Sequence, residues 1–283
     1  MKFARFTPVV NILSGVVFGS GESWSAKTSW SIENMTGNTL FVLNDFIEGV
    51  HMKSSFYLIL TVLSLALMMG ALPDQLVLAQ TEIKLPPPSL TGTMSVEKAI
   101  LGKKSVRRFS PDALDQSQVA QLLWVANGNL PVDAVAGATY KAIPSAGGLY
   151  PLEVFLVTGQ ETVKGVPAGI YAYEARTHSL KLIAQGDHRM ALAHAALSQT
   201  WLAGAPAIIV IGGVFSRSTI KYGNRGIQYV FMESGNSNQN LYLQAEALRL
   251  KMATVGAFQE AQVSSVLKLQ SDVTPLLLVG VGR

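Results

Sequence analysis

The stretch that most constrains the fold of this chain is a glycine-containing loop that leads directly into an apolar run. Residues 144–151 read Pro-Ser-Ala-Gly-Gly-Leu-Tyr-Pro, and residues 154–157 read Val-Phe-Leu-Val, a composition that favours a buried strand. Because adjacent glycines carry no Cβ, the backbone can take positive φ and lie close to a flat ligand, while the flanking prolines restrict the way in and out. On composition alone, an ordinary tight turn explains the loop.

A cluster of cations precedes the loop. Residues 103–109 read Lys-Lys-Ser-Val-Arg-Arg-Phe, which places four cations within six residues. Such a density is costly in self-repulsion unless solvent or an anion neutralises it, and a solvated face is the default interpretation. Ser105 adds a hydroxyl donor, so the cluster also has the charge and the hydrogen bonds that a phosphate monoester needs.

These two stretches, with two others in the expected order, resemble the signatures of the flavin-dependent nitroreductase superfamily and specifically of its SagB-type dehydrogenase branch. The third stretch comprises Lys-Tyr-Gly at 221–223, Glu-Ser-Gly at 233–235 and Gln-Asn-Leu at 239–241, and the last is Val-Gly-Ala-Phe at 255–258. The resemblance covers about residues 95–283 and none of the first ninety. The resemblance is specific because four separate motifs occur in the order that is typical of the family.

The resemblance implies an α+β fold of the nitroreductase type, with a central, mostly antiparallel sheet flanked by helices, and a homodimer with shared FMN sites. FAD is not expected, because no second nucleotide-binding motif is visible. The family more often has arginine at the first basic position, where Lys103 keeps the charge but gives up bidentate geometry. The residues that the resemblance assigns to FMN binding are Lys103, Lys104, Ser105, Arg107, Pro144, Ser145, Ala146, Gly147, Gly148, Gln239, Asn240 and Gly256.

Lys221 and Tyr222 are the candidate catalytic residues. In the SagB-type branch, a lysine-tyrosine pair at this place is implicated in removing a proton as the flavin takes hydride. A lysine that is desolvated near a flavin can act as a base, because burial lowers its pKa. The rival interpretation makes Lys221 an exposed charge at the end of a strand and Tyr222 a packing residue.

Periodicity predicts most of the elements around these motifs. Short helices are expected from Ser95 to Leu101 and after a capping box at Asp115 and Gln118, and an alanine-rich helix between Asp187 and Trp201. Another helix is expected from Gln239, with apolar positions continuing to Met252; on periodicity it is equally a plain core helix. The expected strands are 154–157, a hairpin of 170–173 and 180–183, 207–211 and 276–281.

The first part of the chain is expected to be separate from this domain. Residues 1–51 show no sustained period, and a start at Met52 would make 52–79 an export signal, with cleavage before Gln80. The uncharged run 56–72 is also about as long as the shortest membrane-spanning helices, so an uncleaved anchor is the alternative. Residues 80–94 contain three consecutive prolines and are expected to form a stiff linker to a domain at 95–283.

Composition excludes some classes of function. The chain has no cysteine, so a thiolate nucleophile and a cysteine-ligated metal are ruled out. His178, His188 and His194 show no ligand-like clustering, and no metal is expected. A net charge of +4 on 283 residues does not suggest nucleic-acid binding.

The sequence therefore predicts an FMN-dependent oxidoreductase that transfers hydride through flavin N5, with NADH or NADPH as the electron donor for a small organic substrate. One alternative is a SagB-type dehydrogenase that oxidises a peptide azoline or another carbon–heteroatom bond, without a nicotinamide donor. Another is a non-catalytic flavin-binding protein. The expected location is the periplasm or the medium if the signal is cleaved, the membrane if it is retained, and otherwise the cytoplasm.

Overall fold

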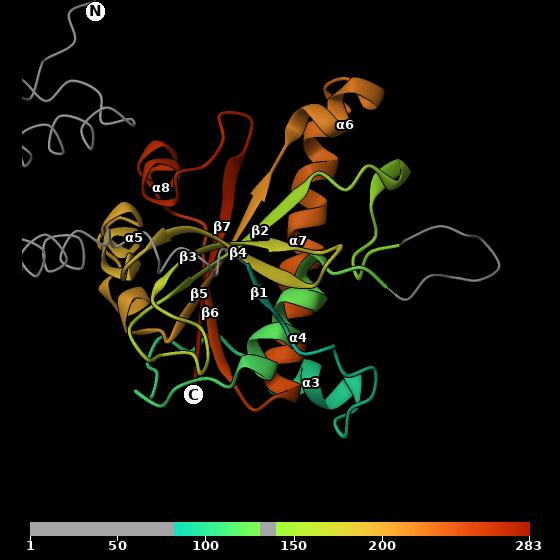
Figure 1. Cartoon of the computed structure of the whole chain (residues 1–283). Helices are drawn as coiled ribbons and strands as arrows, with labels where there is room; N and C mark the ends of the chain where they lie inside the picture. The colour runs from blue at the N-terminus through green and yellow to red at the C-terminus, as the bar shows by residue number, and fades with distance from the viewer. Residues whose placement is uncertain (1–81, 131–139) are drawn as a thin grey trace, which may run out of the picture. The chain divides into compact units, whose positions relative to one another are not determined.

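The computed structural model describes residues 82–130 and 140–283 (Figure 1). The described residues all belong to one compact unit, within 77–283. The expected extension 1–51 and the expected signal or anchor 52–79, including 56–72, lie outside the described residues. Among the described residues, no helix combines the length and the apolar character needed to cross a membrane.

A single antiparallel sheet forms the centre of the domain. Its strand order is β1-β4-β3-β2-β5-β7-β6, and every neighbouring pair in the described part of the chain is antiparallel. This confirms the expected α+β class with a central antiparallel sheet. The strands are β1 (Glu82–Lys84), β2 (Leu152–Thr158), β3 (Gly169–Glu174), β4 (Ser179–Gln185), β5 (Ala207–Gly213), β6 (Lys251–Val255) and β7 (Thr274–Gly282).

Helices cover both faces of the sheet (Figure 1). Every residue of β5 is buried, and alternate residues enter opposite cores, Ile209 with α4 and α7, and Ile208 with α5 and α8. This explains why β5 reads as a continuous apolar run, since a strand covered on both faces has no solvent-facing side. The helices are α3 (Val96–Gly102), α4 (Gln116–Asn127), α5 (Arg189–Ala195), α6 (Phe215–Tyr222), α7 (Arg225–Ala247) and α8 (Glu260–Leu267).

Local signals set several helix ends as expected. The Ser95 hydroxyl accepts a hydrogen bond from the backbone amide of Lys98 at 3.3 Å and caps α3. At the start of α4, Gln118 Oε1 accepts from the backbone amide of Asp115 at 3.0 Å, as a capping box requires. Each bond satisfies an amide that the first helical turn leaves without a partner.

Two expected helices differ from those observed. Helix α7 begins at Arg225, fourteen residues before Gln239, and Met252 lies in strand β6 instead of continuing the helical period. The alanine-rich helix stops at Ala195, because Leu197 and Ser198 take positive φ values of 56° and 58°, and a short 3-10 turn (Thr200–Gly204) follows.

The expected linker is attached to the sheet. Strand β1 pairs with β4 at the sheet edge, and the buried Leu85 donates its backbone amide to the carbonyl of His178 at 3.0 Å. Farther along the chain, the Gln121 side chain forms two hydrogen bonds with the backbone of Ser89. It accepts from the Ser89 amide at 2.8 Å and donates to the Ser89 carbonyl at 3.0 Å. The described residues before α3 therefore contribute to the fold of the domain.

Candidate functional site at the glycine loop and helix α7

The glycine loop folds as a short 3-10 turn between Ser145 and strand β2. Gly147 and Gly148 have φ values of 64° and 65°, which L-residues rarely adopt, and this explains the two glycines. Both glycines are exposed, and no atom lies within 4 Å of the position that a Cβ on Gly148 would take. The loop therefore presents bare backbone to solvent, as close contact with a flat ligand requires.

Lys221 and Tyr222 lie against this loop. They occupy the last turn of α6, which ends where Gly223 takes a φ of 54°. A Cβ built on Gly147 would lie 2.5 Å from Tyr222 Oη and 2.9 Å from Lys221 Nζ. Two stretches more than seventy residues apart in the sequence thus meet. Lys221 is exposed, as the rival interpretation expected, and it is not desolvated by the described residues. It lies at the end of a helix, however, and not at the end of a strand.

On its other side, the loop is held by Glu233 of α7. Glu233 Oε1 accepts from Ser145 Oγ at 2.9 Å and from the backbone amide of Ala146 at 3.0 Å. The side chain of Glu233 is only 3% exposed, and its Oε2 has no hydrogen-bond partner within the described residues. Burial raises the pKa of Glu233, while these two hydrogen bonds and the charge of Lys141 act in the opposite direction.

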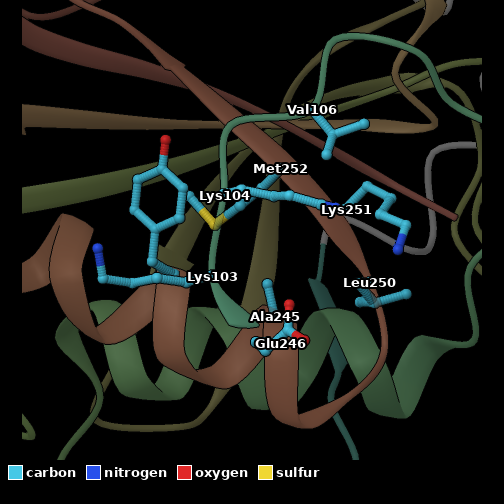
Figure 2. A pocket seen from close by; sticks show the side chains of 9 residues that line it. Lys103, Lys104, Val106, Ala245, Glu246, Leu250, Lys251 and Met252 are labelled. Atoms are coloured by element: carbon cyan, nitrogen blue, oxygen red, sulfur yellow. The ribbon is translucent and has the colours of Figure 1, made fainter. Parts of the chain in front are cut away.

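The basic cluster lies beside the C-terminal half of α7. Ser105 Oγ is 2.8 Å from Tyr242 Oη, and the Lys103 ammonium lies 5.7 Å from the centre of the Tyr242 ring. Figure 2 shows Lys103 and Lys104 lining a small hollow together with Lys251 at the start of β6. Three lysines with one glutamate, Glu246, in its lining give the hollow a positive charge that attracts an anionic group, while its volume of about 10 Å³ is close to that of one water molecule.

Arg107 and Gly256 lie next to the 3-10 turn that follows α5. The Arg107 guanidinium is 5.6 Å from the centre of the Trp201 ring, and Gln199 Nε2 donates to the carbonyl of Ala257 at 3.2 Å. Gly256 is exposed, and a Cβ there would meet only Leu277 Cδ2 at 3.9 Å. This second glycine-containing backbone is also open to a ligand.

The two groups of expected site residues contact α7 at different places. The loop group, built around Pro144–Gly148, Lys221 and Tyr222, meets the helix at Glu233. The basic group, which comprises Lys103, Lys104, Ser105 and Arg107, meets it at Tyr242 through Ser105. Nine residues separate these contacts, which is roughly 14 Å along the helix axis and roughly half a turn around it. The structure therefore does not bring all the expected FMN-binding residues of one chain together.

Gln239 and Asn240 are divided between solvent and the interior. Asn240 Nδ2 donates to the carbonyls of Val125 and Ala142, both at 3.1 Å, and so ties α7 to α4 and to the segment before the glycine loop. Gln239 is exposed. In this geometry Asn240 connects elements of the fold through hydrogen bonds, a role that the sequence did not predict.

Sequence reasoning missed three residues near the site. They are Glu233, Tyr242 and Lys141, whose Nζ donates to Asn127 Oδ1 at 3.1 Å and lies 5.5 Å from the centre of the Tyr150 ring. Burial lowers the pKa of Lys141, and the nearby Arg217 acts in the same direction. Glu233 stands inside a quoted motif, so its position signalled a role, but only the fold shows that it reaches Ser145.

A larger cleft lies elsewhere, between residues 87–99, α4 and the C-terminal half of α7, with a volume of about 810 Å³. Of the expected site residues it contains only Asn240, and no charged side chain lines it. It therefore lacks the chemistry of the candidate site. In the ranges 82–130 and 140–283, no group of three or more His, Cys, Asp or Glu side chains is placed to hold a metal ion.

This antiparallel α+β fold, with bare glycine backbone beside a lysine-tyrosine pair and a separate basic hollow, defines a protein of the nitroreductase class. The Nitroreductase family profile matches residues 100–283. A candidate nitroreductase of Methanocaldococcus jannaschii is 36% identical over 190 residues, which cover 67% of this chain and 91% of that protein. The chain belongs to the nitroreductase family.

Two further relatives refine the comparison. The microcin B17-processing protein McbC of Escherichia coli is 28% identical over 146 residues, which span 50% of this chain and 54% of McbC, in agreement with the SagB-type branch. The crystal structure of a candidate nitroreductase from Ralstonia eutropha JMP134 superposes with a TM-score of 0.60 and 25% identity, over 73% of this chain and 90% of that one. The Escherichia coli McbBCD synthetase complex shares the fold, with a TM-score of 0.55 and 22% identity over 75% of this chain and 81% of that one.

Proposed function

We propose that this nitroreductase-family oxidoreductase uses FMN to transfer hydride to or from a small organic substrate. The observation that carries the proposal is the meeting of Lys221 and Tyr222 with the Gly147 backbone. A flavin supplies the redox chemistry, so the protein needs to provide binding, orientation and proton transfer. Bare loop backbone and an adjacent pair of proton-bearing side chains match these needs.

The residues present fit the two ends of FMN. The hollow lined by Lys103, Lys104 and Lys251 offers positive charge for a phosphate, and the Ser105 hydroxyl lies beside it. The open backbone at Gly148 and Gly256 leaves room for the edge of a planar ring.

We also propose that the site is shared between two copies of the chain. The loop group and the basic group contact α7 on roughly opposite sides, roughly 14 Å apart, so one chain does not surround a single ligand with both. The exposed side of α7 is apolar near its start, where Phe231 and Met232 are 53% and 54% exposed and Gly235 permits close approach. An obligate interface of this kind buries more than about 2,000 Å² in total.

Complementation tests the shared site directly. Lys104→Ala with Arg107→Ala removes two cations of the basic group in one variant, and Lys221→Met with Tyr222→Phe disables the loop group in the other. If each site combines both chains, random pairing gives half mixed dimers with one intact site of two, so co-expression restores about a quarter of wild-type activity. Sites contained within one chain would give no restoration, and a monomer in light scattering would rule out the shared site.

Two reaction directions remain to be separated. A nicotinamide-driven reductase takes hydride from its donor without a base on the enzyme, whereas a dehydrogenase must remove a proton from its substrate as hydride leaves. The position of Lys221 Nζ and Tyr222 Oη at the loop supports the second, SagB-type direction, because general base catalysis needs such a group at the reacting carbon. McbC acts in microcin B17 processing, which makes a peptide azoline a reasonable substrate to test.

The decisive experiment compares flavin reduction by two kinds of donor in the absence of oxygen. The protein is expected to be yellow and to bind FMN. If it is a dehydrogenase, Lys221→Met lowers turnover of an azoline peptide by roughly 10² to 10⁴, the usual contribution of general base catalysis. If it is a reductase, NADH or NADPH reduces the flavin and the same variant changes the rate only several-fold. A protein that takes up no FMN contradicts both directions.

A further inference from the structure

Glu233 is a buried acid in contact with the candidate site. It projects from α7 to the inner side of the glycine loop, while Lys221 and Tyr222 contact the loop at Gly147. Only 3% of Glu233 is exposed. A carboxyl group buried to this degree is costly unless hydrogen bonds compensate, so its position requires an explanation.

The contacts of Glu233 close a small network around the loop. One oxygen, Oε1, accepts from Ser145 Oγ at 2.9 Å and from the amide of Ala146 at 3.0 Å, and Ser145 Oγ in turn accepts from the amide of Tyr150 at 2.8 Å. Both ends of the loop therefore depend on one carboxyl oxygen. The residues between them, Gly147 and Gly148, have positive φ and provide few restraints of their own.

We propose that Glu233 is a positioning residue that holds the glycine loop against Lys221 and Tyr222. Because Glu233 belongs to helix α7, the position of this rigid helix determines the conformation of the loop. Its effect on FMN binding and turnover rests on the proposed function, whereas its effect on the loop does not. Glu233 acts through the loop and touches none of the reacting atoms, so the loop is where its removal should first be measured.

Two substitutions separate the hydrogen bonds from the charge. Glu233→Ala removes the acceptor and leaves the Ser145 hydroxyl and the Ala146 amide without a partner, which destabilises the bonded form of the loop. Glu233→Gln keeps an oxygen that accepts both bonds but removes the negative charge. Ser237→Ala is the matched control, because Ser237 is another buried polar residue of α7, and its hydroxyl donates to the Ala126 carbonyl at 2.8 Å, away from the loop.

Hydrogen exchange of the protein without added flavin is the first measurement. Amides that lose their acceptor are exposed by local opening, so Glu233→Ala should accelerate exchange at Ala146 and Tyr150 by about tenfold or more. Glu233→Gln and Ser237→Ala should leave both rates within about threefold of wild type. Unchanged exchange in Glu233→Ala, with the variant folded, would overturn the proposal. Equal acceleration in Ser237→Ala would also overturn it, because the effect would then belong to α7 in general.

The second measurement uses FMN-loaded protein. Glu233→Ala should weaken FMN binding about tenfold and alter the flavin absorption bands, while Glu233→Gln should restore both, as expected for a role that depends on accepted hydrogen bonds. Normal binding, normal spectrum and normal turnover in Glu233→Ala, despite rapid exchange of the loop, would overturn the positioning role. If wild-type protein binds no FMN, the proposed function fails, and the exchange data alone still decide whether Glu233 holds the loop.

Discussion

The substitution Gly147→Ala, compared with Gly165→Ala, is expected to distinguish a loss of stability from a loss of activity. Gly147 has a φ of 64°, and Gly165, in an exposed surface turn, has a φ of 72°. An L-residue in this region costs about 1–2 kcal/mol. Gly147→Ala and Gly165→Ala should therefore lose similar amounts of stability from backbone strain.

The neighbours of the new methyl group differ between the two positions. At Gly165 the nearest atom would be Gln116 Nε2 at 3.7 Å, an ordinary contact, whereas at Gly147 Tyr222 Oη would lie at 2.5 Å. To restore a contact of 3.4 Å, the lower limit of ordinary packing, the tyrosine oxygen must move by about 0.9 Å, the difference between the two distances. A misplacement of about 1 Å typically costs about 10²-fold in rate, or about 2.7 kcal/mol of transition-state stabilisation.

The assay is turnover per bound flavin, with urea unfolding of the same samples. Gly147→Ala should fall about 10²-fold in rate, and Gly165→Ala should stay near wild type in rate although it carries a similar backbone strain. Because Tyr222→Phe removes the clashing oxygen, Gly147→Ala should cost less stability in the Tyr222→Phe background than in wild type. Full turnover per flavin in Gly147→Ala would refute the importance of the contact between the loop and the Lys221–Tyr222 pair.

Three further outcomes are expected. Burial lowers the pKa of His178 below 6.5, so the folded state takes up a proton at this side chain less readily than the unfolded chain does. The free energy of unfolding, measured with urea, should therefore fall as the pH decreases below 6.5, and it should fall less in His178→Gln. Burial raises the pKa of Glu233 above 4.5, so the stability that this shift contributes to the folded state is present below pH 4.5 and is lost as the pH rises through the folded-state pKa. The stability of Glu233→Gln relative to wild type should therefore increase with pH over that range. A constant difference between the two proteins would contradict this expectation. We propose that residues 52–79 are an export signal, and N-terminal sequencing of the mature protein should then begin at Gln80, whereas retention of 56–72 would indicate an anchor.

Five of the seven strands in the described residues were predictable because their signals are local, whereas β1 and β6 were not expected. Residues 154–157 and 207–211 are short apolar runs bounded by turn residues, and they form the interiors of β2 and β5. The hairpin of β3 and β4 follows from alternation around a polar turn. Ser95 and Gln118 indicated two helix starts, because each forms a capping hydrogen bond with a residue only three positions away.

Elements that depend on distant partners were harder to predict from the sequence. The middle of α7 carries three buried polar residues, Glu233, Ser234 and Ser237, which break its apolar period. The partners of Glu233 and Ser237 lie in the glycine loop and in α4, whereas the Ser234 hydroxyl donates to the Phe231 carbonyl of α7 itself. The attachment of residues 82–90 depends on His178 and Gln121, which no local pattern links to a proline-rich stretch. Motifs therefore identified the candidate groups, but only the fold shows that Lys221 and Tyr222 meet Gly147.

Helix α7 has a consequence for how two sites in a dimer would respond to each other. Its Glu233 end supports the loop group and its Tyr242 end contacts the basic group, so in a shared arrangement each α7 would border both flavin sites. A 23-residue helix moves as a nearly rigid rod, and a small shift imposed by one ligand would be felt at the other site. Cooperative FMN binding, or unequal reactivity of two chemically identical sites, would then require no separate regulatory element.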